Sequence, residues 1–155
     1  MFPTGEHRFH HAKFTLVAKT YEEGSPRRQE LLKYALRFST GAEAAFGTDG
    51  ASAKRAGGKR GLPLTLEELC RYNSSELQGR MVDVQRSIVE QKAVHESVQA
   101  ALAEVDKGAR LLHFERGSVA RKPSFWGGFV HPGRGTVYGE NMLGQLWDAE
   151  RDLSK

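Results

Sequence analysis

Histidines are the side chains in this sequence best suited to metal chemistry, and three of them stand together near the N-terminus. His7, His10 and His11 form the pattern H-x2-H-H, and imidazole nitrogens at this spacing can bind transition metals. A structural zinc site needs four ligands, however, and the single cysteine, Cys70, lies far away in the sequence. We therefore interpret the cluster as part of a polar N-terminal arm and predict no metal site.

His95 is the next candidate, because it follows Gln91 by four residues. A general base or a haem ligand would need a nucleophile or carboxylate constellation around it, and the sequence shows none. We interpret His95 and Gln91 as a buried polar pair that sets the register of a helix, as polar seam residues do in coiled coils. No phosphate-binding loop or dinucleotide fingerprint is present. We predict that the protein is not an enzyme and holds no cofactor.

His131, Pro132 and Gly133 resemble the haem loop of cytochrome b5-type domains, and residues 64–69 and 79–84 resemble two further stretches of that family. The resemblance would imply haem held by two axial histidines. No histidine follows His131, and the heptad spacing described below predicts a helix where the family has a strand. We therefore assign no haem site.

A basic, glycine-rich segment spans residues 47–61, GTDGASAKRAGGKRG. It has no large apolar side chain, so it cannot bury enough surface to fold alone. Two basic pairs stand in it, and these four residues are our candidates for phosphate contacts: Lys54, Arg55, Lys59 and Arg60. We favour a solvated flexible linker, with an arm that becomes ordered against RNA phosphates as the alternative.

Charge is distributed unevenly along the 155 residues, whose formal net charge is +4. Residues 1–61 hold 11 basic and 6 acidic side chains, residues 62–107 hold 5 and 8, and residues 108–155 hold 7 and 5. Basic flanks suit phosphate, anionic lipid headgroups or an acidic protein surface. The single cysteine excludes an intramolecular disulfide framework, and no apolar run approaches the roughly 20 residues of a membrane span.

Helices dominate the expected secondary structure, so we predict a mainly α protein. Ser25 and Pro26 predict a helix over about 26–38. Thr65 and Glu68 form a capping box that starts a helix over about 66–72, and Ser75 with Gln78 offers a second box. Asn141 is expected to cap a terminal helix over about 141–153. The alternating apolar residues of 13–21 weakly predict a short strand.

The strongest periodic signal is a heptad seam over about four heptads, which predicts one helix from about 76 to 106. Such a helix would be roughly 45 Å long and would need a partner helix from another chain. The seam consists of Leu77, Met81, Val84, Ile88, Gln91, His95, Val98, Leu102 and Val105.

Aromatic side chains recur in the Gly- and Pro-rich segment 117–139 and in the helix after it. Burying one such ring stabilises by about 1.5–3 kcal/mol, so we predict an extended docking strap that packs on its own helices or on neighbours. Its residues are Phe125, Trp126, Phe129, Tyr138 and Trp147.

These features divide the chain into four parts. We expect an N-terminal arm and helix over 1–46, the linker over 47–61, a helical coiled-coil segment over 62–108, and the strap with its terminal helix over 109–155. The combination of long helix, basic loop and aromatic strap predicts a chain that is stabilised mainly by neighbours.

The predicted function is therefore a non-catalytic structural accessory subunit of a large multiprotein assembly, with other protein subunits as partners. A mitochondrial respiratory-chain or ATP synthase complex is favoured. The alternative is a mitochondrial ribosomal protein whose basic arms contact rRNA, including Arg116, Arg121, Lys122 and Arg134. A cytoskeletal or ciliary structural protein is a third class. The N-terminus is basic and poor in acids, which favours mitochondrial import, with a soluble intracellular location as the alternative.

Overall fold

A computed structural model describes residues 1–114 and 123–153 and confirms a mainly α protein. The chain separates into two compact units, Met1–Val84 and Gln85–Lys155. Within the described residues, no helix combines the length and apolar character that crossing a bilayer requires. Arg116, Arg121 and Lys122, which we expected to face phosphate, lie outside the described residues.

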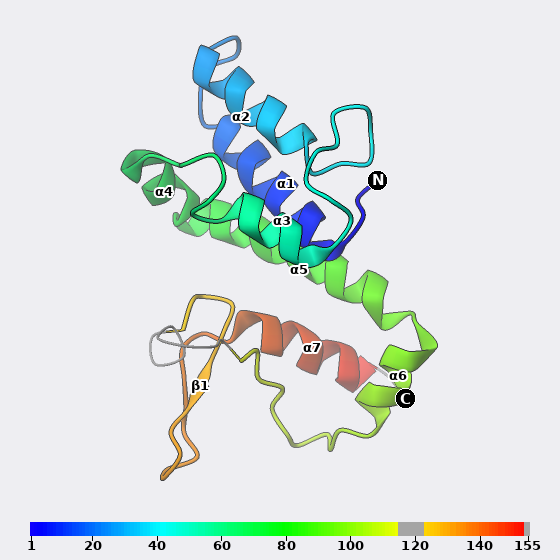
Figure 1. Cartoon of the computed structure of the whole chain (residues 1–155). Helices are drawn as coiled ribbons and strands as arrows, with labels where there is room; N and C mark the ends of the chain where they lie inside the picture. Colours follow the sequence, from blue (N-terminus) through cyan, green and yellow to red (C-terminus); the bar gives the residue numbers. More distant parts are fainter. Residues whose placement is uncertain (115–122, 154–155) are drawn as a thin grey trace. The chain divides into compact units, whose positions relative to one another are not determined.

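The N-terminal unit is a helical bundle built around α1 (Gly5–Ala18). Helix α2 (Pro26–Leu36) runs back along α1, α3 (Gly50–Gly57) lies across it, and α4 (Leu66–Tyr72) also contacts it (Figure 1). The start of α5 (Ser75–Ala93) adds Leu77 to the core. The core residues are Phe14, Val17, Ala18, Leu31, Ala35, Phe38, Ala53 and Leu77.

The first helix replaces the strand that we predicted over 13–21, and that prediction was wrong. Thr4 caps α1 by accepting a hydrogen bond from the His7 N–H. His7, His10, Phe14 and Val17 then follow at spacings of three and four, and all are buried. A face with that spacing packs only as a helix, so it outweighs the short alternation at positions 14, 16 and 18.

Helix α3 stands where we predicted a flexible linker, so the expectation of a segment without packed structure is corrected. Asp49 caps it by accepting from the Ser52 N–H at 2.9 Å. Ala53 is fully buried and Gly57 lies directly against the His10 ring. Small side chains let α3 approach α1 closely, so the segment is ordered by what it packs against and not by bulky apolar groups of its own.

The predicted capping box of α4 is confirmed. The Thr65 hydroxyl accepts from the Glu68 N–H at 3.1 Å, and the Glu68 carboxylate accepts from the Thr65 N–H at 2.9 Å. The second box, from Ser75 to Gln78, is wrong by one residue. Ser74 is the residue whose hydroxyl accepts, from the Leu77 N–H at 3.3 Å.

One continuous helix over 76–106 is also wrong. Helix α5 ends at Ala93, and α6 (Glu96–Ala103) begins after His95, whose backbone is extended at φ −73° and ψ 132°. Gln91 and His95 are exposed, so they do not form a buried pair. The seam divides by burial: Leu77, Met81, Ile88 and Leu102 are buried, and Val84, Val98 and Val105 are half-buried.

The C-terminal unit contains α6, a short antiparallel pair and α7 (Met142–Leu153). Strand β1 (Phe129–Val130) pairs with β2 (Val137–Tyr138), with Phe129 opposite Tyr138. The terminal helix predicted over 141–153 is confirmed, but its capping is different. The Asn141 side chain binds the segment 111–113 instead. Its amide nitrogen donates to the Leu111 carbonyl at 2.8 Å, and its amide oxygen accepts from the His113 N–H at 2.9 Å.

Backbone carbonyls of the strap replace a side-chain cap on α7. The Met142 N–H donates to the Phe125 carbonyl and the Leu143 N–H donates to the Trp126 carbonyl, each at 3.2 Å. The first N–H groups of a helix have no partner within the helix, and the strap supplies acceptors for two of them. The described part of the strap, residues 123–139, therefore belongs to the C-terminal unit itself, and its Phe125, Trp126 and Phe129 side chains are half-buried.

Candidate nucleic-acid interface

Cations and aromatic rings meet in a surface hollow of the N-terminal unit. Helix α2 contributes Lys33, Tyr34 and Arg37, and the loops on either side of α3 contribute Phe46 and Arg60. The hollow has a volume of about 420 Å³. We call it the basic-aromatic groove, together with the adjoining hollow of about 380 Å³ that shares Tyr34, Phe46 and Arg60.

Two rings form the floor of this groove. The centroids of Tyr34 and Phe46 are 5.1 Å apart, and the rings are tilted by 56°. The Arg37 guanidinium carbon lies 4.7 Å from the Phe46 centroid and 5.6 Å from that of Tyr34. A cation this close to ring faces is held by the ring quadrupole, so Arg37 is positioned while its side chain stays exposed.

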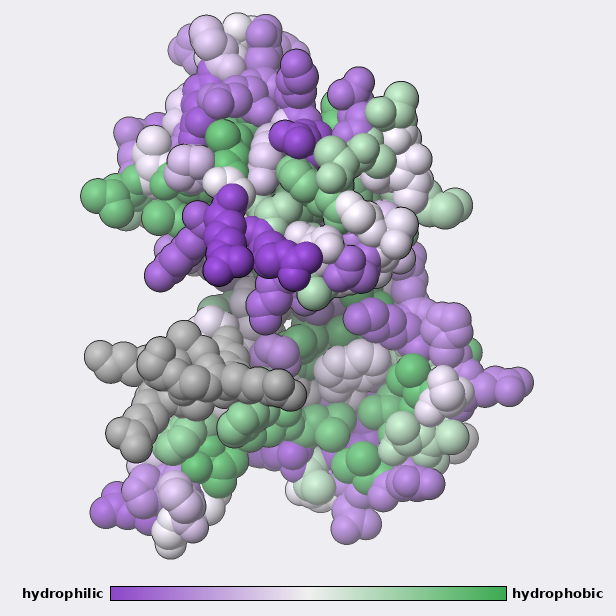
Figure 2. Space-filling view, in the orientation of Figure 1, coloured by the Kyte–Doolittle hydropathy of each residue, from purple (hydrophilic) through white to green (hydrophobic). Residues whose placement is uncertain are grey.

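The groove carries excess positive charge. Arg55 lines the second hollow and donates to the Ser52 hydroxyl at 3.0 Å. Among the described lining residues, Lys33, Arg37, Arg55 and Arg60 are cations and Glu30 is the single carboxylate. Glu30 is already paired, because Arg27 donates to it at 2.8 Å. In Figure 2, strongly hydrophilic side chains gather over α3 on the visible face of this unit.

Close backbone packing holds the loop that carries Arg60. The Tyr34 hydroxyl donates to the Ala56 carbonyl at 2.8 Å. A Cβ placed on Gly61 would lie 1.7 Å from that carbonyl oxygen and 2.5 Å from the Tyr34 hydroxyl. Only glycine fits at this position, so the loop after α3 lies directly against the Tyr34 hydroxyl and Arg60 is placed at the groove.

The four predicted phosphate contacts divide into two groups. Arg55 and Arg60 line the basic-aromatic groove. Lys54 and Lys59 are exposed but are not among the residues that line it. The structure thus places two of the four predicted residues at the groove, together with Lys33 and Arg37 of α2, which the prediction of phosphate contacts did not include.

The N-terminal histidines are packed inside the unit. His7 is fully buried, with Nδ1 2.8 Å from the Thr4 hydroxyl and Nε2 3.1 Å from the carbonyl oxygens of Phe46 and Gly47. Carbonyl oxygens can only accept, so Nε2 is the donor in these two contacts. His7 therefore fixes the loop that carries Phe46. The His11 ring packs against Phe2 at a tilt of 57°, and burial lowers the pKa of His11, with the nearby N-terminal charge acting in the same direction.

His10 differs from its neighbours, because its Nδ1 is buried without a partner while Nε2 lies 3.5 Å from the Glu6 carboxylate. It also packs beside Phe38, with centroids 5.7 Å apart. Within the described residues, no three His, Cys, Asp or Glu side chains are placed to hold a metal ion. The histidine cluster is divided among three different packing environments.

His131 and Cys70 lie at the surface. The Nδ1 atom of His131 accepts from the Gly133 N–H at 3.2 Å, which closes the turn between β1 and β2. Of the strap residues, Phe125 and Trp126 form a T-shaped pair at 5.1 Å, and Tyr138 is 44% exposed. Trp147 lines a small apolar cavity of about 290 Å³ with Leu102 and Leu111.

Comparison with protein-family models, curated proteins and solved structures finds no match to this chain. We therefore infer its function from the residues themselves.

Sequence reasoning missed the aromatic floor because no local pattern links Tyr34 with Phe46. They are twelve residues apart, in a helix and in a loop. Lys33 and Arg37 stand four apart, on either side of Tyr34, and residues four apart share a helix face. That spacing was the available signal for a basic surface on α2.

Proposed function

We propose that this protein is a non-catalytic subunit of a ribonucleoprotein assembly and that its basic-aromatic groove binds single-stranded RNA. The observation that supports this most directly is the position of Arg37, Arg55 and Arg60 around the rings of Tyr34 and Phe46. Proteins that bind single strands combine a positive groove for the phosphates with aromatic faces for the bases.

The two parts of the groove have separate roles in this proposal. Arg55 and Arg60 neutralise backbone phosphates, which supplies affinity without sequence preference. The Phe46 and Tyr34 rings, half-buried beside Arg37, offer an edge or face against which a splayed base packs. Among the assemblies considered from sequence, this arrangement favours the mitochondrial ribosomal alternative over the respiratory-chain or ATP synthase complex. The mitochondrial location is a proposal that rests on the basic N-terminus.

Fluorescence anisotropy with a labelled oligouridine tests the proposal. Wild-type affinity should fall as salt rises. The double variant Arg55→Gln/Arg60→Gln should bind more weakly, and its slope of log K against log salt should drop by roughly 0.7 for each phosphate that is no longer neutralised. Phe46→Leu should weaken binding while leaving the salt slope unchanged, because it removes stacking and keeps the charge.

Arg80→Gln is the matched control. Arg80 is an exposed arginine of the same unit that lies 3.6 Å from Glu76 and is outside the groove. Its replacement removes one positive charge. If RNA binding depended only on long-range attraction to the total charge, each removed charge would weaken binding equally in the control and in the double variant. Equal reductions per charge, or a wild-type protein without salt-dependent RNA affinity, would rule out the groove as an RNA site.

A further inference from the structure

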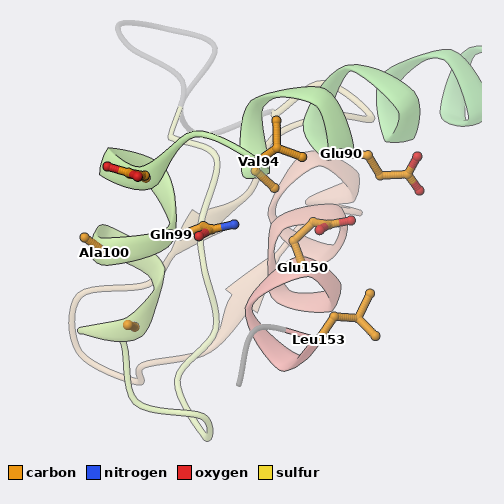
Figure 3. A pocket seen from close by; sticks show the side chains of 9 residues that line it. Glu90, Val94, Gln99, Ala100, Glu150 and Leu153 are labelled. Carbon is orange, nitrogen blue, oxygen red and sulfur yellow. The ribbon is translucent and has the colours of Figure 1, made fainter.

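We propose that the C-terminal unit binds a cationic amphipathic helix of a protein partner in an acidic groove between its helices. The groove has a volume of about 600 Å³ and lies between the end of α5, helix α6 and helix α7. Figure 3 shows Glu90 and Val94 on and just after α5, Gln99 and Ala100 on α6, and Glu150 and Leu153 on α7 around it.

The groove also contains aliphatic side chains that are exposed to water. Val94 is 71% exposed and Leu153 is 74% exposed, and both line it. Ala93, Ala100 and Ala103 form the remaining apolar lining. Small side chains along a helix allow another helix or its long side chains to come close, whereas bulky ones would fill the space. Covering two exposed aliphatic side chains would contribute favourably to association.

The charge of the groove selects the partner. Among its described lining residues are Glu90, Glu96 and Glu150, and none is a lysine or arginine. Glu90 and Glu96 are both exposed and supply the acidic charge of the groove. An acidic rim around exposed aliphatic groups is complementary to a helix with Lys or Arg beside Leu or Ala.

A helix is the favoured form of the occupant because the walls are themselves helices. Gln99 and Ala103 are four residues apart on α6, and Glu150 and Leu153 are three apart on α7. Each wall therefore presents one helix face. A third helix placed in this space would pack its ridges of side chains into the grooves of these two walls, as helices generally do. Its Lys or Arg side chains would then reach the carboxylates of the groove.

Anisotropy of a labelled helical peptide tests the proposal on the full-length protein. The probe is a peptide of about 18 residues with Leu, Lys and Ala at helical spacing. Wild-type protein should bind it, and affinity should fall with added salt. Glu90→Gln/Glu96→Gln should weaken binding by about threefold for each charge, near the middle of the range for exposed pairs. Leu153→Ser should weaken it without changing the salt dependence.

Matched variants outside the groove provide the controls. Glu140→Gln removes one exposed carboxylate of the same unit, and Leu66→Ser removes one exposed leucine of the other unit; Leu66 is 83% exposed. Neither should change peptide affinity. The proposal is overturned if Glu140→Gln weakens binding as much as Glu96→Gln does, or if the peptide with Glu in place of Lys binds equally well. Because the basic-aromatic groove is untouched by these variants, oligouridine binding should stay at its wild-type level.

Discussion

The Arg27 side chain on α2 binds the Glu68 carboxylate on α4 through two hydrogen bonds, 2.7 Å from Nε to Oε1 and 2.8 Å from Nη2 to Oε2. Glu68 is fully buried. It also accepts from the Tyr21 hydroxyl at 2.7 Å and from the Thr65 N–H at 2.9 Å. Glu68, which completes the capping box of α4, thus also anchors α2 through Arg27. The pair joins residues that are 41 positions apart in the sequence.

Removing this anchor should destabilise the N-terminal unit. Glu68→Ala leaves the Arg27 guanidinium, the Tyr21 hydroxyl and the start of α4 without their shared acceptor. Breaking a buried pair from one side costs about 3–5 kcal/mol, and urea unfolding followed by circular dichroism measures the change. Glu67→Ala on the same helix is the control. The Glu67 side chain is 72% exposed and pairs with Arg71, so its removal should cost no more than about 1 kcal/mol.

Stability should also depend on pH through Glu68. The Arg27 guanidinium is the main reason that the pKa of Glu68 falls from 4.5 to about 2, and the hydrogen bonds from Tyr21 and Thr65 add to the effect. A carboxyl whose pKa is lower in the folded state contributes stability above its unfolded pKa. That contribution, about 3 kcal/mol, is lost as pH falls from about 5 to about 2.

The Glu68→Gln variant isolates this pH effect. Asp49, the cap of α3, also has a lowered pKa because Ser52 donates to it, so the wild-type curve contains more than one group. The difference between wild type and Glu68→Gln should shrink steadily between about pH 5 and pH 2 in urea titrations. A difference that stays constant across this range would show that the pKa of Glu68 is the same in the folded and unfolded states.

Two glycine substitutions should have opposite effects. A Cβ on Gly57 would lie 2.0 Å from the His10 Nδ1 atom, so Gly57→Ala forces α3 away from α1 and should cost about 1–3 kcal/mol. Gly79 lies inside α5 with nothing within 4 Å of an added Cβ. Gly79→Ala should stabilise by about 0.5–1 kcal/mol, because alanine favours helix. Thermal melts of both variants compare the two; destabilisation by Gly79→Ala would contradict the assigned helix.

Asn141 should contribute strongly to the stability of the C-terminal unit. It is 5% exposed, has a left-handed backbone with φ 46°, and holds Leu111 and His113 through its amide. Asn141→Ala removes both bonds and adds backbone strain, whereas Asn141→Gly removes the bonds alone. We expect both variants to lower the melting temperature. Asn141→Ala should lower the free energy of unfolding by about 1 kcal/mol more than Asn141→Gly does. Equal effects would mean that the backbone conformation carries no cost.

The sequence by itself predicted the helices whose signals are local. Ser25 with Pro26 starts α2, and the Thr65 and Glu68 exchange starts α4 at the expected residue. Capping depends on groups three residues apart, so no distant contact is needed to identify it. The two basic pairs, Lys54 with Arg55 and Lys59 with Arg60, were noted in the same way from residue type and spacing, and the structure places one arginine of each pair at the groove.

Only tertiary structure decided the rest, because the deciding contacts join residues far apart in the sequence. Helix α3 exists by packing Ala53 and Gly57 against α1, although its own composition predicts a linker. The helix break at His95 goes against a heptad pattern that continues through it. The aromatic floor under Arg37 forms when a loop brings Phe46 to Tyr34. Periodicity describes which faces are apolar, and it does not describe which surface each face meets.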